Sequence, residues 1–378
     1  MTKTVITARE VVSARVVAQQ LDRAVADRPL TDAAVLDLGV QDTGRDSASW
    51  ALVNRGVPVA GPETLAGSAD LALVWSLRGA PHFYRRADLP DVAVAVSPFS
   101  EADAAKRVIG AEQPLREAGI SSREGLAVVA DRLREVVAAP MAKGEVSTRL
   151  AAVLDPPYVR DCVACGAVHS WEQPFRIGAF FGGLELEPGT SPPVLRRIAD
   201  WPSRAPGPAA DPMAAPERLQ VVRGYLRLLG PAAPADVAGF LDAALADVKA
   251  HWPDEAVPVQ VDGHRAWSLG DFQPVAVADD LVRLLGPYDL LLQGRDRQLL
   301  VTDRSLHQAL WPSLGRPGAV LVGSEIVGTW RPKASGKRFS VRVELWTRPG
   351  AAARARIEEQ AALLAQHRGL TFAGVLTA

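Results

Sequence analysis

An amide, a carboxylate and a hydroxyl stand side by side at Gln41, Asp42 and Thr43, between Gly39 and Gly44. An amide and a carboxylate can orient a water molecule, and a carboxylate can offset positive charge that develops in a transition state. The two glycines allow the backbone to turn on either side of the three polar residues. The same residue types also form ordinary loops, so the pattern alone indicates either a polar site or a simple connection.

Two predicted hairpins carry cations that could contact nucleic acid. Arg78 and His82 flank the turn in LRGAPH, where they could probe a DNA groove or be structural. The second hairpin, around RPKASGKR, would present its cations to phosphates. A solvated turn favours the same lysine, glycine and serine residues, so both interpretations stay open. The cations of the second hairpin are Arg331, Lys333, Lys337 and Arg338.

Cys162, Cys165 and His169 have a Cys-x-x-Cys…His spacing that could bind zinc if a fourth ligand were supplied. His82 or a distant carboxylate is a candidate for that ligand. The surrounding segment is predicted to be helical, and the i, i+3, i+7 spacing then places the three side chains on one face, as in a buried core. We therefore predict no metal site and no cofactor.

Composition limits the class of protein. The chain has 378 residues, 48% of them hydrophobic, and a formal net charge of −1, so nucleic-acid contacts must come from local clusters of Lys and Arg. Two cysteines exclude a disulfide framework and suit a reducing compartment. We find no signal-peptide core, no membrane-spanning stretch, and no hydrolase, Walker or dinucleotide-binding motif. We therefore expect a cytoplasmic, nucleoid-associated protein.

Helix and turn signals order the elements that would hold the polar loop. Thr7 and Glu10 form a capping-box pattern at the start of a predicted amphipathic helix over residues 7–21. A short helix, another helix over residues 47–55 and a hairpin over residues 71–84 follow. Three helices followed by a hairpin is the order of elements in a winged helix.

Residues 216–269 repeat this order more clearly. An amphipathic helix, two shorter helices and a hairpin around Asp262 and Gly263 follow one another, and Asp-Gly is a strong signal for a two-residue turn. We interpret this stretch as a winged helix. Between the two units the chain is predicted to be mostly helical, through the segment that contains Cys162 and Cys165.

The C-terminal part is rich in predicted strands. The sequences LLLQ, QLLVTD, AVLVGSEIVGTWRP and RFSVRVELW indicate short antiparallel strands, which suggest a small β-barrel or sheet, and a closing helix covers residues 351–367. The fold class is therefore α+β, with tandem winged-helix units and this barrel. The predicted domains are residues 1–97, residues 98–201, a Pro-rich linker over residues 202–215, residues 216–275 and residues 276–378.

Five stretches of the chain combine into a familiar pattern: VQDTGRDSASWAL, VWSLRGAPH, YLRLLGPAAPADVAGFL, LLGPYDLLLQGRDRQLLVTD and RPGAVLVGSEIVGTWR. Together, and in this order, they resemble the AlkZ/YcaQ winged-helix DNA glycosylases, a bacterial family common in actinomycetes. The resemblance implies about three tandem winged helices and a β-barrel that form a C-shaped channel around duplex DNA. It also implies excision of bulky N7-alkylated purines, including crosslinked ones, often as self-resistance to a genotoxic natural product.

Members of this family usually carry a glutamine–apolar–glutamine motif, and the matching positions here hold Gln41, Asp42 and Thr43. The apolar middle residue has become a carboxylate and the last glutamine has become a threonine. N7-alkylation makes guanine cationic and weakens its glycosidic bond, so catalysis needs a positioned water and stabilisation of an oxocarbenium-like sugar. Our hypothesis is that Asp42 or Gln41 orients the water, Asp42 offsets the positive charge, and Thr43 completes the hydrogen bonding.

We therefore predict a monomeric DNA glycosylase that hydrolyses the N-glycosidic bond of bulky N7-alkylguanine in double-stranded DNA. One alternative is a winged-helix protein that binds DNA or a damaged base without cutting, with the altered motif as a relic. A transcription regulator is another alternative. Against it, the chain has no obvious dimerisation helix and is far longer than one operator-reading domain requires.

Overall fold

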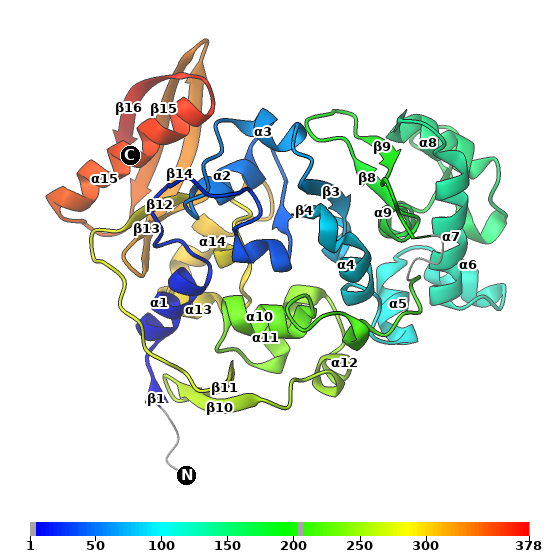
Figure 1. Cartoon of the computed structure of the whole chain (residues 1–378), viewed down its shortest axis with the longest axis horizontal. Coiled ribbons are helices and arrows are strands. Elements are labelled where there is room, and N and C mark those ends of the chain that lie inside the picture. Colours follow the sequence, from blue (N-terminus) through cyan, green and yellow to red (C-terminus); the bar gives the residue numbers. More distant parts are fainter. Residues whose placement is uncertain (1–4, 203–206, 378) are drawn as a thin grey trace.

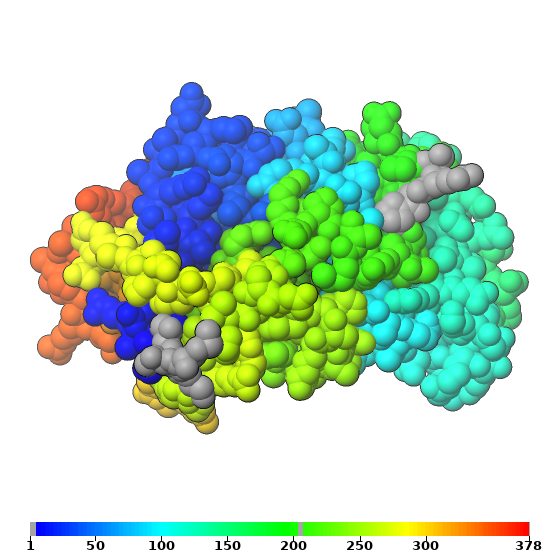
Figure 2. All heavy atoms as spheres, turned by 60° about the horizontal axis from the view of Figure 1, so that its bottom comes forward, coloured from blue at the N-terminus to red at the C-terminus, as the bar shows by residue number. Residues whose placement is uncertain are grey.

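The computed structural model describes residues 5–202 and 207–377, and these residues form four β-sheets with helices packed between and beside them (Figure 1). The helical part that includes α5 (Glu101–Arg107) and α7 (Ser122–Val136) forms one end of the molecule. The C-terminal sheet and α15 (Ala351–His367) form the opposite end, in yellow to red in Figures 1 and 2. Within the described residues, no helix is both long and apolar enough to cross a membrane. The predicted α+β class is confirmed.

The first predicted helix is confirmed, and it packs against the C-terminal part of the chain. Helix α1 (Ala8–Ala18) begins after Thr7, which forms the predicted capping box with Glu10. Val12 and Val16 on this helix belong to a buried hydrophobic cluster. The other members of that cluster include Leu285, Leu291 and Ile326. A helix from the start of the sequence therefore supports elements formed near its end.

Short elements surround the polar loop. The predicted helix before the loop is a single 3-10 turn, Ala34–Asp37, and strand β2 (Val40–Gln41) follows it. Helix α2 (Ser47–Val53) comes next, as predicted, and its Trp50 is buried. Helix α3 (Pro62–Ala66) then leads into the central sheet.

One six-stranded sheet joins the regions predicted as the first and second domains. The strand order is β2-β4-β3-β8-β9-β5, and β3 pairs with β8 at Leu73 and Leu186. Strand β2, which carries Gln41, is therefore an edge strand. The other strands are β3 (Leu71–Trp75), β4 (Pro81–Arg85), β5 (Met141–Ala142), β8 (Leu184–Leu186) and β9 (Val194–Arg197). The further helices of these regions are α4 (Leu89–Ala95), α6 (Glu112–Glu117), α8 (Lys143–Ala151) and α9 (Glu172–Phe181).

The segment with the two cysteines is a β-hairpin, so the prediction of a helix there is wrong. Strand β6 (Val159–Cys162) pairs with β7 (Ala167–Ser170) in a separate two-stranded sheet. Gly166 has φ +61° at the turn, a left-handed conformation that ends any helical path. The β-branched residues at Val159 and Val168 also favour strands. The cysteines are consequently at a hairpin tip and not in a helical core.

The order of elements predicted for residues 216–269 is confirmed. Three helices precede a hairpin whose turn residues, Asp262 and Gly263, both have positive φ. Strand β1 (Val5–Ile6) pairs in parallel with the first strand of that hairpin. The elements are α10 (Val221–Leu229), α11 (Pro234–Leu241), α12 (Leu245–Ala250), β10 (Ala256–Val261) and β11 (His264–Leu269).

The Pro-rich linker predicted over residues 202–215 is described only in part, because residues 203–206 lie outside the described residues. Pro212 and Ala215 in its second half are buried. This half of the linker therefore packs against the rest of the chain.

The C-terminal sheet is open, so the predicted closed barrel is wrong. Its order is β12-β13-β14-β15-β16, and β16 runs parallel to β15. The first and last strands of this order do not pair. Helix α15 lies between β15 and β16 in the sequence, as a parallel connection requires (Figure 1). The strands are β12 (Val282–Leu285), β13 (Gly318–Val322), β14 (Glu325–Ser335), β15 (Arg338–Leu345) and β16 (Thr371–Thr377).

Two predicted strands in this part are also wrong. LLLQ is a 3-10 helix, Leu290–Gln293, because Asp289 caps it by accepting a hydrogen bond from Leu291 N at 3.1 Å. QLLVTD begins in the short helix α13 (Arg297–Leu300), and α14 (His307–Leu310) follows. The number of winged helices and the C-shaped channel stay predictions.

A buried ion pair joins α2 to the Leu290–Gln293 segment. Arg55 donates to both carboxylate oxygens of Asp289, at 2.8 and 2.9 Å, and both residues are buried. Arg55 also donates to Gln19 Oε1 at 3.0 Å and to Ala51 O at 2.8 Å. A buried charge is tolerated only when its partners remain in place.

We expect Asp289→Ala to lower the free energy of unfolding by about 3–5 kcal/mol, because it leaves the Arg55 guanidinium buried without its partner. Urea unfolding followed by circular dichroism measures the effect. Glu112→Ala is the matched control, since it breaks the Arg116–Glu112 pair, whose side chains are 69% and 52% exposed. The control should cost at most about 1 kcal/mol. Equal losses in the two variants would contradict the structural role of the buried pair.

Candidate active site

Backbone pairing with the central hairpin sets the position of the polar loop. Gln41 is in register with His82, and Asp42 N donates to Pro81 O at 2.9 Å. Gly39, just before β2, has φ +83°, and a Cβ atom there would lie 2.4 Å from the Tyr84 ring. Glycine is therefore required at this position for the loop to approach the hairpin.

The three polar side chains do not share one face. Gln41 Nε2 donates to Thr43 Oγ1 at 2.9 Å, so these two side chains meet on one side of the loop. The Asp42 carboxylate instead accepts a hydrogen bond from Ala48 N, at 3.2 Å, in the first turn of α2. Asp42 thus caps the helix that follows the loop, and the structure brings together Gln41 and Thr43 only.

Gln41 lines a cationic cavity of about 260 Å³. Two of its wall residues, Arg295 and Ser313, are exposed, so the cavity opens to solvent. Among the described residues its wall contains no carboxylate, because neighbouring Asp296 pairs with Arg15 instead. The remaining wall residues are Arg78, Phe240, Tyr288, Leu292, Gln293, Arg297 and Arg316.

Mutual repulsion among the four arginines makes this cavity favourable for anions. Burial, followed by the charge of Arg295, lowers the pKa of Arg78 to about 10. Burial and the charges of Arg295 and Arg316 also lower the pKa of Arg297. Aromatic rings hold three of the guanidinium groups, with Arg316 lying 5.7 Å from the centre of the Tyr288 ring. A phosphate in this cavity would relieve the repulsion.

Asp42 lines a different cavity, of about 600 Å³, with an acidic wall. Its other carboxylates include Asp46, which forms a salt bridge with Arg368 and is buried. Burial raises the pKa of Asp42, and the charge of Asp46 acts in the same direction. An acidic wall disfavours contact with DNA phosphates, so the two sides of the loop differ in electrostatic character.

Arg78 and His82, predicted to contact DNA, are tied into the protein. Arg78 is half-buried and donates to Phe240 O at 2.6 Å and to Gln293 Oε1 at 2.8 Å. His82 is buried, and its Nδ1 lies 2.9 Å from Ala80 O. Burial lowers the pKa of His82 to about 3, which keeps the ring neutral. His82 therefore supports β4 behind Gln41, whereas Arg78 borders the cationic cavity.

The four cations of the predicted RPKASGKR hairpin are exposed at the β14–β15 hairpin, which projects from the C-terminal sheet (Figure 1). Arg331 donates to Gly315 O at 2.7 Å. Lys333, Lys337 and Arg338 lie on the last residues of β14, in the turn and at the start of β15. The hairpin has the predicted shape, and its contact with phosphates stays a prediction.

Sequence reasoning missed the arginines that surround Gln41. Arg295 and Arg297 belong to the stretch QGRDRQ, whose two closely spaced cations are a weak signal. Arg316 comes from a loop before β13. These residues are more than 250 positions away from Gln41 in the sequence, so only the folded chain reveals that they face it.

We expect Asp42→Asn to be more stable than the wild type at pH 7. The raised pKa of Asp42 means that its ionisation favours the unfolded state, and asparagine removes this cost while it can still accept the hydrogen bond from Ala48 N. The difference should vanish below about pH 4, where the carboxyl group is protonated in both states. Urea titrations over this pH range measure it, and equal midpoints at pH 7 would contradict the burial of the charge.

Comparisons with known proteins identify the family. The family model described as DNA glycosylase AlkZ-like matches residues 14–367. The structure of Streptomyces sahachiroi DNA glycosylase AlkZ is similar in fold, with a TM-score of 0.71 at 20% identity, covering 98% of this chain and 99% of that chain. The comparison with curated proteins gave no significant match. Because the family model extends from within α1 to the last residue of α15, the chain belongs to the AlkZ-like DNA glycosylases.

Proposed function

We propose that this DNA glycosylase hydrolyses the N-glycosidic bond of bulky N7-alkylguanine in double-stranded DNA. The observation that carries the proposal is the position of Gln41, which donates a hydrogen bond to Thr43 and lines a cavity whose charged wall residues are all arginines. The cavity is open to solvent, so a large N7 substituent would not be excluded by a closed pocket. Action on crosslinked guanines, self-resistance to a DNA-alkylating natural product and a monomeric enzyme belong to the same proposal.

In the proposed step, the bond between deoxyribose C1′ and guanine N9 breaks and water adds to C1′. The cationic base leaves with the bonding electron pair as neutral N7-alkylguanine, and the water loses a proton to solvent. Gln41 Nε2 donates to Thr43, so Gln41 Oε1 remains available to orient the water. We assign no part in this step to Asp42, because its carboxylate caps α2. This replaces the sequence-based hypothesis for Asp42.

The arginines of the cavity would bind the DNA backbone beside the lesion. Guanidinium groups bind phosphate oxygens in a bidentate geometry, and no nearby carboxylate competes for Arg295, Arg297 or Arg316 among the described residues. Such contacts fix the register of the duplex but do not identify the base. Recognition of the lesion would then depend on the cationic base and on Gln41 and Thr43.

We expect Gln41→Ala to lower the single-turnover excision rate by about 10²-fold, the typical loss when one positioned hydrogen-bonding group is removed. The substrate is a duplex oligonucleotide with one N7-alkylguanine, and alkali cleavage of the abasic product gives the rate. Asp42→Leu, which restores an apolar middle residue, is the matched control and should excise within a few-fold of wild type. A wild-type rate in Gln41→Ala, or a larger loss in Asp42→Leu, would contradict the assignment.

The same assay separates the proposal from its alternative. Wild-type protein that binds the alkylated duplex but produces no abasic site with any adduct size would favour a non-catalytic lesion-binding protein. The departure of Asp42 and Thr43 from the family's usual motif is the observation that favours this second function. A series of N7 adducts of increasing size also measures the bulk that the site accepts.

We expect Arg295→Gln with Arg316→Gln to weaken binding to duplex DNA and to reduce the slope of log K against log salt by about one for each lost phosphate contact. Fluorescence anisotropy at several salt concentrations gives the slope. Lys333→Gln with Lys337→Gln tests the β14–β15 hairpin in the same way. This double variant should also reduce the slope of log K against log salt. Arg116→Gln, at an exposed position on α6, is the control. An unchanged slope in the first double variant would overturn the proposed phosphate contact.

A further inference from the structure

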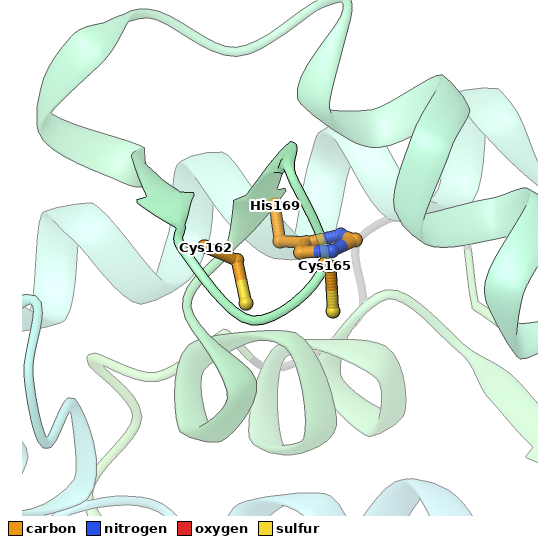
Figure 3. A group of neighbouring side chains, drawn as sticks. All are labelled: Cys162, Cys165 and His169. Carbon is orange, nitrogen blue, oxygen red and sulfur yellow. The ribbon is translucent and has the colours of Figure 1, made fainter.

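The β6–β7 hairpin places three metal-ligating side chains together at its tip (Figure 3). The chain reverses between Cys162 and Gly166, whose backbone N–H donates to Cys162 O at 2.9 Å. Cys165 N donates to the same oxygen at 3.1 Å. This tight turn brings the two thiols to one side, and His169 on the returning strand adds its imidazole ring. One ligand atom from each of the three side chains lies within 4.8 Å of the others.

Hydrophobic packing does little to hold this tip. Val163, between the two cysteines, is 98% exposed, and Val168 on β7 is 46% exposed. The two strands of this sheet have four residues each, and an isolated two-stranded hairpin is marginally stable in water. The hairpin therefore needs another source of order, and a metal ion bound by its three side chains would cross-link the two strands at the turn.

The chemistry of these side chains matches zinc. Thiolate and imidazole are the ligands that Zn²⁺ prefers, with Zn–S near 2.3 Å and Zn–N near 2.0–2.1 Å, so only small side-chain rotations would be needed to close the site. His169 Nδ1 lies 3.3 Å from Ser147 Oγ on α8, which leaves Nε2 free to bind a metal.

We propose that Cys162, Cys165 and His169 bind one Zn²⁺ ion, with a water molecule in the fourth position. This replaces the sequence-based prediction of no metal site, which assumed a helix where the structure has a hairpin. Among the described residues, no further His, Cys, Asp or Glu belongs to this group. Binding releases the thiol protons and involves no change of oxidation state. Through Ser147, the bound ion also fixes the hairpin against α8. The proposal concerns the structure of this hairpin, and it does not depend on the reaction proposed for Gln41.

Metal analysis of the full-length protein, purified without chelator and without a histidine tag, tests the site. We expect about one zinc per chain by mass spectrometry of the metal. Cys162→Ser and Cys165→Ser should reduce the zinc content at least tenfold, and His169→Ala should weaken binding. His264→Ala, at an exposed histidine of β11, is the matched control and should keep its zinc. Since the chain has two cysteines, thiolate-to-metal absorption after Co²⁺ substitution can come from this hairpin alone.

A second readout does not need the variants to fold. Removing zinc from the wild type with a chelator should increase amide hydrogen exchange over residues 159–170 and leave residues 256–269 unchanged. Three results would overturn the proposal: reduced wild-type protein that binds neither Zn²⁺ nor Co²⁺, an intact mass that shows a Cys162–Cys165 disulfide in the protein as isolated, or equal loss of zinc in His264→Ala.

Discussion

The buried ion pair between Arg55 and Asp289 is the interaction on which the candidate active site depends. The two residues are 234 positions apart, and both are withdrawn from solvent. Arg55 follows α2, the helix that begins just after the polar loop. Asp289 comes shortly before Gln293, Arg295 and Arg297, which line the cationic cavity. A small cavity lined by Gln41, Arg55 and Asp289 shows how closely the pair lies behind the site. The pair thus fixes where the two halves of the site meet.

Strand alternation gives the polar loop its chemistry. Successive side chains of a strand point in opposite directions. Gln41, at the end of β2, lines the cationic cavity and donates a hydrogen bond to Thr43, whereas the carboxylate of Asp42 is turned to α2. A carboxylate on the same side as the arginines would pair with them and reduce their attraction for phosphate. The half-buried carboxylate of Asp42 is accommodated because the backbone N–H of Ala48 donates a hydrogen bond to it. Burial still disfavours the ionised form of this carboxylate, and the pKa of Asp42 is raised for that reason.

The loop and the cysteine hairpin illustrate different routes to order. The loop is held from behind by buried groups, among them Tyr84, whose hydroxyl donates to Leu38 O at 3.2 Å, and His82. The tip of the β6–β7 hairpin has almost no such support, because its apolar residues face solvent. Its chemistry lies in Cys162, Cys165 and His169, which are spaced for a metal ion. The protein thus stabilises one turn by packing and, as we propose, the other by coordination.

Local patterns in the sequence determined much of the secondary structure. The capping box at Thr7, the Asp262–Gly263 turn and the alternation of β15 depend on near neighbours, so their structures agree with prediction. The family, too, could be inferred from ordered stretches of sequence. The predicted strand at LLLQ is wrong because a short apolar run suits both a strand and a helix, and the cap at Asp289 favours the helix.

Only the tertiary structure decided which residues meet. The sequence by itself located Gln41, Asp42 and Thr43, but it could not separate Asp42 from the other two, since that depends on the pairing of β2 with β4 and on the position of α2. It could not bring Arg295 and Arg316 to Gln41 either. Contacts between distant parts of the chain depend on how sheets and helices pack, and no local pattern of residues encodes that packing.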